Sequence, residues 1–234
     1  MTDMADDVNK KMAYSAERIF VMPFFLDVRG RSCLLVGGEG EAIRKGLALL
    51  NAGASLIVVA ERLAAELAVA VQEGRALWRN EPFVAAHLDG VWLAVSTCAD
   101  ETVNARIHAA AEERRVWLNV VDQPRYCTVT WPAVVEHPPV CVAISTGGAA
   151  PALAGYLRQR IGAVVPERIG LLARHMARWR QQVPGGLAVR AAFWRGMMDQ
   201  GLVERFLSGD EAGAEAMVRT ALQQADPPLL ADRS

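Results

Sequence analysis

Short hydrophobic runs alternate with stretches of helical periodicity through the first half of the chain. The runs lie at residues 32–36, 56–59, 76–78, 91–96 and 116–121, and the helical stretches lie at residues 42–50, 64–74 and 100–113. Continuous apolar runs that alternate with helices are typical of buried strands in a parallel sheet. The pattern therefore predicts an α/β fold with a doubly wound parallel sheet. A further strand is predicted at residues 24–27, joined to the first run by a turn at Arg29 and Gly30.

The turn between the first run and its helix carries the glycine pattern of a Rossmann-type dinucleotide-binding loop, with one flaw. Gly37 stands where the tight turn is made and Ala42 where helix packs on strand, but Glu39 occupies the place at which backbone approaches a pyrophosphate. A carboxylate about 5 Å from a phosphate would cost roughly 3 kcal/mol at an effective dielectric of 20. It could also occupy the helix N-terminus itself. Gly38 and Gly40 keep the loop pliable, so Glu39 could instead turn outward, and a glycine-rich turn without any ligand is the structural alternative.

Two other strand ends carry candidate chemistry. Glu61 follows the second run, where an acidic residue commonly binds the adenosine ribose, while the adjacent Arg62 could accept a 2′-phosphate, so the preference for NAD over NADP is modest. Asp122 follows the run at 116–121, where a carboxylate can act as a base or an acid or hold a cation. The structural alternatives are two solvated loop charges and a turn-forming aspartate before proline.

The pattern changes after residue 124. Two apolar runs at 128–135 and 140–145, joined at 136–139, predict a pair of strands outside the sheet, which often builds a subunit interface. The remainder is helical, with segments at 152–161, 167–182, 189–201 and 212–224. We therefore divide the chain into a disordered tail (1–17), a Rossmann domain (18–127), a small β dimerisation region (128–164) and a C-terminal helical domain (165–234).

Composition narrows the class of protein. The 234 residues are 52% hydrophobic and 22% charged, and the net charge of −1 argues against a nucleic-acid binder, whose affinity would rest on neutralising phosphates. No apolar run is long enough to span a bilayer, and the polar N-terminus lacks the features of a signal peptide, so we expect a cytoplasmic protein without membrane association. The four cysteines form no CxxC pair and predict buried free thiols, and without a Cys/His cluster we expect no permanent metal site.

Five motifs in order are more specific than any one of them. They are Val-Gly-Gly-x-x-x-Ala-x-Arg-Lys from residue 36, Ala-Gly-Ala from 52, Thr-x-x-x-x-x-Val-Asn from 97, Asn-Val-Val-Asp-x-Pro from 119, and Ala-Ile-Ser-Thr-Gly-Gly-x-x-Pro-x-Leu-Ala from 143. Together they resemble the precorrin-2 dehydrogenase family, which includes the N-terminal module of siroheme synthase, over residues from about 22 to 169. The methyltransferase module that is fused to siroheme synthase is not expected in this chain.

The resemblance implies a homodimer that oxidises the tetrapyrrole precorrin-2 to sirohydrochlorin with NAD. Some members then insert ferrous iron to give siroheme, acting as sirohydrochlorin ferrochelatase. Position by position, Asp122 matches the family's essential aspartate, which would accept the proton. The matching cofactor-binding positions are Gly37, Gly38, Gly40, Glu41, Glu61, Arg62 and Cys98. The substrate-binding positions are Asn119, Ser145, Thr146, Gly147, Gly148 and, in the basic helical part that would suit a polycarboxylate, Arg158.

Departures from the family pattern gather around the expected cofactor cleft. The family prefers glycine at position 39, a Val-Ala pair where Glu41-Ala42 stands, and a threonine followed by acidic or amide residues where Cys98-Ala99 stands. The alternative hypotheses are therefore a tetrapyrrole-binding or chelatase-type protein of the same fold that has lost NAD binding, and a structural partner module. Glu39 is the residue that discriminates between the first of these and a dehydrogenase.

Overall fold

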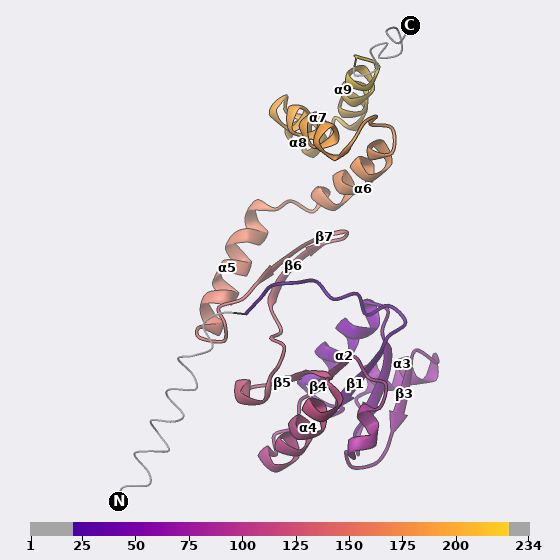
Figure 1. Ribbon diagram of the computed structural model, residues 1–234, viewed down its shortest axis with the longest axis vertical. Helices are drawn as coiled ribbons and strands as arrows, with labels where there is room; N and C mark the ends of the chain where they lie inside the picture. The colour runs from indigo at the N-terminus through magenta and orange to yellow at the C-terminus, as the bar shows by residue number, and fades with distance from the viewer. Residues whose placement is uncertain (1–20, 225–234) are drawn as a thin grey trace, which may run out of the picture. The chain divides into compact units, whose positions relative to one another are not determined.

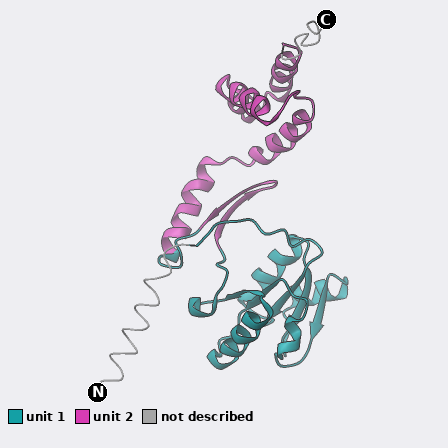
Figure 2. Ribbon diagram, in the orientation of Figure 1, with its two compact units in different colours: residues 1–131, 145–151 teal, residues 132–144, 152–234 magenta. Residues whose placement is uncertain are grey.

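The computed structural model describes residues 21–224, so the predicted tail at 1–17 lies outside the described residues. The chain divides into two compact units (Figure 2). Unit 1 comprises Met1–Trp131 and Ser145–Pro151, and unit 2 comprises Pro132–Ile144 and Ala152–Ser234. The domain limits expected from the sequence stay a prediction, because the two units are defined by contacts between residues and not by function. The second unit contains both the hairpin and the C-terminal helices.

Unit 1 is built on a five-stranded sheet in which every described pairing is parallel. Its strands are β1 (Ser32–Val36), β2 (Ser55–Val59), β3 (Ala76–Arg79), β4 (Leu93–Ser96) and β5 (Trp117–Val120). Their spatial order is β3-β2-β1-β4-β5, with the order reversing between β1 and β4. This is the doubly wound Rossmann arrangement that the apolar runs predict.

Helices cover both faces of this sheet (Figure 1). Helices α2 (Glu41–Asn51) and α3 (Ala65–Gln72) pack on the face that buries Leu35, and α4 (Glu101–Arg114) packs on the face that buries Leu34. Successive strand residues point to opposite faces, so a strand buried on both sides must be apolar throughout. The short 3₁₀ turns η1 (Ala85–Leu88) and η2 (Pro124–Tyr126) complete the unit.

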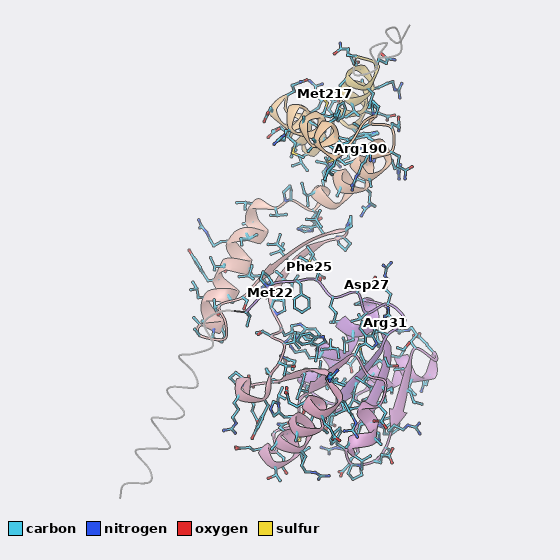
Figure 3. The ribbon with its side chains drawn as sticks, viewed as in Figure 1. Met22, Phe25, Asp27, Arg31, Arg190 and Met217 are labelled. Atoms are coloured by element: carbon cyan, nitrogen blue, oxygen red, sulfur yellow. The ribbon has the colours of Figure 1, made fainter. Side chains whose placement is uncertain are left out.

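The strand predicted at residues 24–27 is wrong. That segment has no regular secondary structure, and Phe25 within it and Met22 just before it are largely exposed (Figure 3). The physical reason is that β1 already has parallel partners on both edges, β2 and β4, so no edge is free to pair with a preceding strand. The turn at Arg29 and Gly30 is confirmed, with the Gly30 nitrogen donating to the Gly53 carbonyl at 2.8 Å.

Unit 2 begins with an antiparallel hairpin, β6 (Ala133–His137) and β7 (Val140–Ile144), in the register His137 to Val140. The predicted first strand of this pair began too early, at residue 128. Residues 128 and 129 instead donate their backbone N–H groups to the Leu118 carbonyl, at 2.8 and 3.1 Å, and so attach to the end of the Rossmann sheet.

Five helices follow, α5 (Pro151–Val164), α6 (Arg168–Arg180), α7 (Leu187–Asp199), α8 (Leu202–Leu207) and α9 (Glu211–Gln224). Helices α6 to α9 share a core that includes Leu172, Trp179 and Phe206. Helix α8 was not predicted as a separate helix. Gly201, with φ 85°, lies directly before α8 and separates it from α7. No helix within residues 21–224 is long and apolar enough to cross a bilayer.

Candidate nucleotide and substrate site

The candidate site lies at the carboxyl ends of the strands of unit 1, where doubly wound sheets bind ligands. At the switch point, Gly37 follows β1 with φ 115°, and a Cβ there would lie 2.1 Å from the Thr97 hydroxyl. The Thr97 nitrogen donates to the Val36 carbonyl at 2.9 Å. Only glycine therefore fits at position 37, as the fingerprint predicts.

The second glycine, Gly38, is held against the end of β2. A Cβ on Gly38 would lie 2.0 Å from the Arg62 carbonyl oxygen, and the Gly38 carbonyl accepts a hydrogen bond from the Ala64 nitrogen at 2.8 Å. The glycine turn and the segment after β2 are thus locked together through backbone. The predicted cofactor residues Gly37, Gly38 and Arg62 lie in one place.

Glu39 turns away from the helix rather than occupying its N-terminus. Its carboxylate pairs with the Arg62 guanidinium at 3.0 Å, and the N-terminus of α2 has no side-chain cap. The backbone N–H groups of the first helical turn are therefore not taken up by a carboxylate of this loop. The sequence left two orientations open for the Glu39 side chain, toward the helix N-terminus or outward, and the structure shows the outward one.

Space for an anion remains beside this helix end. Gly40, the residue before α2, has φ 58°, and a Cβ built on it would meet nothing within 4 Å. Glu41 lies in the first turn and pairs with Arg44 at 2.6 Å, which lowers the pKa of the Glu41 carboxyl. A helix N-terminus without a side-chain cap, behind a glycine turn, fits the pyrophosphate of a dinucleotide. Glu61 lies exposed in the segment that follows β2.

Cys98 follows β4 and is held by a buried polar cluster. The Ser96 hydroxyl donates to the Asn104 side-chain carbonyl at 2.6 Å, and the Asn104 amide donates to the Cys98 carbonyl at 2.8 Å. Asp100 caps α4 by accepting from the Thr102 nitrogen at 2.7 Å. These hydrogen bonds fix the backbone at Cys98, the residue that departs from the family pattern.

Asp122 lies just past β5 in a left-handed backbone conformation, with φ 59°. It is one of two described non-glycine residues with positive φ, a conformation that costs energy and concentrates at functional sites. The neighbouring Val121 nitrogen donates to the Ser96 carbonyl at 2.9 Å, which ties this strand end to β4. The side chain is exposed. The turn thus presents a carboxylate to solvent at the ligand-binding edge of the sheet.

Asn119, on β5, is buried, and its amide donates to the Val129 carbonyl at 3.0 Å. Cys127 Sγ lies 3.2 Å from the backbone nitrogen of Val120. These contacts fasten residues 127–129 beside β5. Within the structure Asn119 therefore orders the segment next to Asp122, and its predicted contact with substrate remains a prediction.

The sequence interpretation missed Lys45. It lies on α2 and is 4% exposed, and its ammonium nitrogen sits 4.1 Å from the centroid of the Trp131 ring. Burial lowers its pKa from 10.5 to about 8, against the opposing influence of acidic neighbours that include Asp122. A signal was available, because Lys45 falls on the buried stripe of α2 between Ala42 and Leu49, a position where an apolar residue is expected.

The loop at residues 145–151 organises itself through its hydroxyls. Ser145 Oγ accepts from the Gly147 nitrogen at 3.1 Å, and Thr146 Oγ1 accepts from the Ala150 nitrogen at 3.2 Å. Gly147 and Gly148 have φ of 64° and 83°, and a Cβ on Gly148 would meet nothing within 4 Å. The backbone of this loop is therefore open to a ligand.

Arg158 lies exposed on α5. Within residues 21–224, no group of three or more His, Cys, Asp or Glu side chains is arranged to hold a metal ion.

Three family models match successive parts of the chain. A model of an NAD(P)-binding domain matches residues 24–133, the central region of sirohaem biosynthesis proteins matches residues 139–163, and the sirohaem synthase dimerisation region matches residues 168–222. The last of these falls on helices α6 to α9 rather than on the hairpin. Where the subunit interface lies thus stays a prediction.

A glycine turn at the switch point of a doubly wound sheet defines a protein with a Rossmann-type NAD(P)-binding domain. The chain is 40% identical to siroheme synthase of Azotobacter vinelandii over 214 residues and 36% identical to that of Salmonella typhi over 199 residues. The chain belongs to the family of sirohaem biosynthesis proteins that these models and relatives define, in agreement with the resemblance that the five motifs indicate.

The alignments cover more of this chain than of its relatives. The alignments cover 90% and 83% of this chain but 46% and 44% of the relatives, so the chain spans about half the length of the curated proteins it matches. A solved structure titled "SirC, precorrin-2 dehydrogenase" superposes with a TM-score of 0.68 over 88% of this chain and 99% of that one. At 21% identity, this likeness supports the fold.

Proposed function

We propose that this protein oxidises precorrin-2 to sirohydrochlorin with NAD in siroheme biosynthesis. The observation that carries the proposal is the outward position of Glu39, paired with Arg62, which leaves the N-terminus of α2 without a side-chain cap behind a glycine turn. The alternative of a chelatase-type protein that has lost its cofactor rested on that glutamate. With Glu39 paired, its charge is balanced and it does not compete with a pyrophosphate for the helix end.

The chemistry divides between cofactor and protein. When bound, the nicotinamide ring supplies the hydride acceptor. Oxidation of the macrocycle breaks two bonds to hydrogen. One hydrogen leaves as a hydride with both electrons, and the other leaves as a proton while its bonding pair stays in the macrocycle. Asp122 accepts that proton on its carboxylate, because it is exposed at the carboxyl edge of the sheet that holds the glycine turn. Gly37 and Gly38 let the dinucleotide approach backbone, and Ser145 to Gly148 offer an open loop to the tetrapyrrole.

NAD is favoured over NADP by the same ion pair. A 2′-phosphate needs an unpaired cation at the end of β2, and the Arg62 guanidinium is already engaged by Glu39 at 3.0 Å. Glu61 lies exposed beside it, where a carboxylate accepts hydrogen bonds from ribose hydroxyls and repels a phosphate. We therefore propose NAD as the cofactor, and a homodimer as the working assembly, since the dimerisation-region match covers residues 168–222.

Anaerobic incubation with precorrin-2, with and without NAD, tests this function. We expect the absorption of sirohydrochlorin to appear only when NAD is present, together with NADH absorption in equal amount. A matched reaction with NADP should be slower at equal concentration. Appearance of sirohydrochlorin at the same rate without any nicotinamide, or no oxidation together with no calorimetric heat of NAD binding, would overturn the proposal. Addition of ferrous iron to the completed reaction tests chelation separately.

A further inference from the structure

The chain returns to the outer edge of β5 directly after the turn that carries Asp122. β5 is the last strand of its sheet, and its alternate residues Leu118 and Val120 direct backbone polar groups to that edge. Buried backbone groups at a strand edge need hydrogen-bond partners. Side chains of the returning segment supply part of them, and at Val120 the partner is the thiol of Cys127.

The Cys127 thiol contacts both ends of the turn that carries Asp122. The Val120 nitrogen donates to Cys127 Sγ at 3.2 Å, and Sγ lies 3.2 Å from the Val120 carbonyl oxygen and 3.6 Å from the Gln123 carbonyl oxygen. A thiol has one proton to donate and a sulfur that accepts weakly, so it can serve an N–H group and a carbonyl together. Since Val120 and Gln123 flank residues 121 and 122, the thiol bridges the two ends of the turn.

Cys127 is itself held in place from several directions. It is buried in the apolar core on the α4 face of the sheet. Its nitrogen donates to the Pro124 carbonyl at 3.1 Å, and the carbonyl oxygen of the preceding Tyr126 lies 3.1 Å from His108 Nδ1 on α4. Because backbone and core fix the position of Cys127, its thiol is a firm point of attachment for the turn.

The backbone conformation of Asp122 makes this attachment important. With φ 59°, Asp122 adopts a left-handed conformation that a non-glycine residue keeps only when its surroundings enforce it. The bond from the Val121 nitrogen to the Ser96 carbonyl, at 2.9 Å, fixes the turn from the side of β4, and the Cys127 thiol fixes it from the outer edge. The direction of the exposed Asp122 carboxylate therefore depends on a backbone that these two contacts hold.

We propose that Cys127 is a positioning residue for Asp122, a buried thiol that holds the turn from Val120 to Gln123 in the conformation that presents the proton-accepting carboxylate. The role rests on the proposed oxidation of precorrin-2. A proton acceptor works only within hydrogen-bond reach of the hydrogen that it removes. A small displacement of the turn therefore slows the step, although substrate still binds.

Three variants of the full chain test this role by kinetics. Cys127→Ser keeps a donor and an acceptor, Cys127→Ala keeps neither, and Thr128→Val is the matched control. Thr128 Oγ1 accepts from the Leu118 nitrogen at 2.7 Å, which is the same kind of contact on the same strand, two residues farther from the turn. We expect Cys127→Ala to lower kcat about 10- to 100-fold and to leave KM within about twofold. Cys127→Ser should stay within about threefold of the wild-type kcat, and Thr128→Val should match the wild type.

Amide hydrogen exchange, measured by NMR on the ¹⁵N-labelled chain, tests the attachment without any turnover. In Cys127→Ala the Val120 amide should exchange at least about tenfold faster than in the wild type, while the Leu118 amide keeps its rate. Thr128→Val should give the reverse pattern, because it removes the acceptor of the Leu118 nitrogen. The amide of Val58, buried within β2, reports any general loss of stability in either variant.

The outcomes keep the possible failures apart. Wild-type kcat in Cys127→Ala, an equal loss of kcat in Cys127→Ala and Cys127→Ser, or an unchanged exchange rate of the Val120 amide would each overturn the positioning role. A loss of kcat in Thr128→Val as large as that in Cys127→Ala would overturn it too, because loosening of the whole strand edge would then explain both. If the wild-type protein oxidises no precorrin-2, the proposed function fails and the role in proton transfer falls with it, whereas the exchange rates still decide whether the thiol holds the turn.

Discussion

The two strand ends that carry the candidate chemistry handle charge in opposite ways. After β1, Glu39 and Arg62 form an ion pair whose side chains are 56% and 81% exposed. After β5, the carboxylate of Asp122 is exposed, and Lys45, a cation whose lowered pKa Asp122 opposes, is 4% exposed with its ammonium over the Trp131 ring. Both ends lie at the carboxyl edge of one sheet, so the difference comes from side-chain placement rather than from topology.

The difference matters because exposed and buried charges respond differently to a ligand. An exposed ion pair contributes little to stability, so loss of the pair between Glu39 and Arg62 should cost little free energy of folding. A buried charge is fixed, and its field is present before the substrate binds. Substitution of the exposed pair should therefore change stability little, whereas substitution of the buried Lys45 should change it more. Substitutions at the two ends should differ in size and in pH dependence.

The largest effect should come from Asp122. Asp122→Asn keeps a residue that tolerates the left-handed conformation at φ 59°, so the fold and the dimer should survive. Loss of the proton acceptor should lower kcat by about 100- to 10,000-fold. Stopped-flow absorption of NADH measures this, with Glu112→Gln on the exposed face of α4 as the control. Wild-type turnover in Asp122→Asn would remove the aspartate from the mechanism and with it the contrast between the two strand ends.

Stability should show the charge buried at Lys45. A pKa lowered from 10.5 to about 8 corresponds to about 3 kcal/mol, and Lys45→Met should recover about 1–3 kcal/mol at pH 7 because the lost Trp131 contact offsets part of it. The folded state binds fewer protons than the unfolded state between pH 8 and 10.5, so wild-type stability rises with pH over that range. The advantage of Lys45→Met should therefore shrink there. Urea unfolding from pH 7 to pH 10 measures it, and a difference that is constant with pH would contradict a buried cation.

The backbone of the glycine turn should be less tolerant than its charges. Gly38→Ala would place a Cβ 2.0 Å from the Arg62 carbonyl oxygen, which belongs to backbone and cannot swing away. We expect a loss of about 1–3 kcal/mol in stability and weaker NAD binding. Gly196→Ala, within α7 where a Cβ meets nothing within 4 Å, is the matched control and should be neutral or stabilising by up to about 1 kcal/mol. Thermal unfolding and NAD titration of both variants would decide, and equal behaviour of the two would contradict the close packing at Gly38.

The sequence predicted the sheet well because its strands are buried on both faces, so apolar runs and strands coincide at β1, β2 and β4. The same signal was wrong at residues 24–27, since composition does not reveal that both edges of β1 are occupied. The sequence also could not predict the direction in which the Glu39 side chain points. Glu39 turns toward Arg62 only because the fold brings the end of β2 next to the glycine turn.

Lys45 shows a different limit. Its place in the Arg-Lys motif was visible, and so was the apolar stripe of α2 on which it lies. The sequence could not predict which residues surround Lys45 in the fold. Trp131, whose ring the ammonium contacts, and Asp122, which opposes the lowering of its pKa, are both far from Lys45 along the chain. A charged residue at a core position of a helix was the available warning, and such residues are rarely buried without a reason.

The smallest effect should come from the ion pair of the turn. Glu39→Gln removes an exposed charge, so stability should change by less than about 0.5 kcal/mol. It also releases Arg62, which then becomes available to a 2′-phosphate, and the ratio of NADP to NAD affinity should rise a few-fold. Adding Arg62→Gln should reverse that gain, since no cation remains. Calorimetric titration of both cofactors at low and high salt measures the ratio. If Glu39→Gln instead strengthens NAD and NADP equally, the carboxylate acts on the pyrophosphate rather than through Arg62, and the turn is not the charge-balanced element that the contrast with β5 requires.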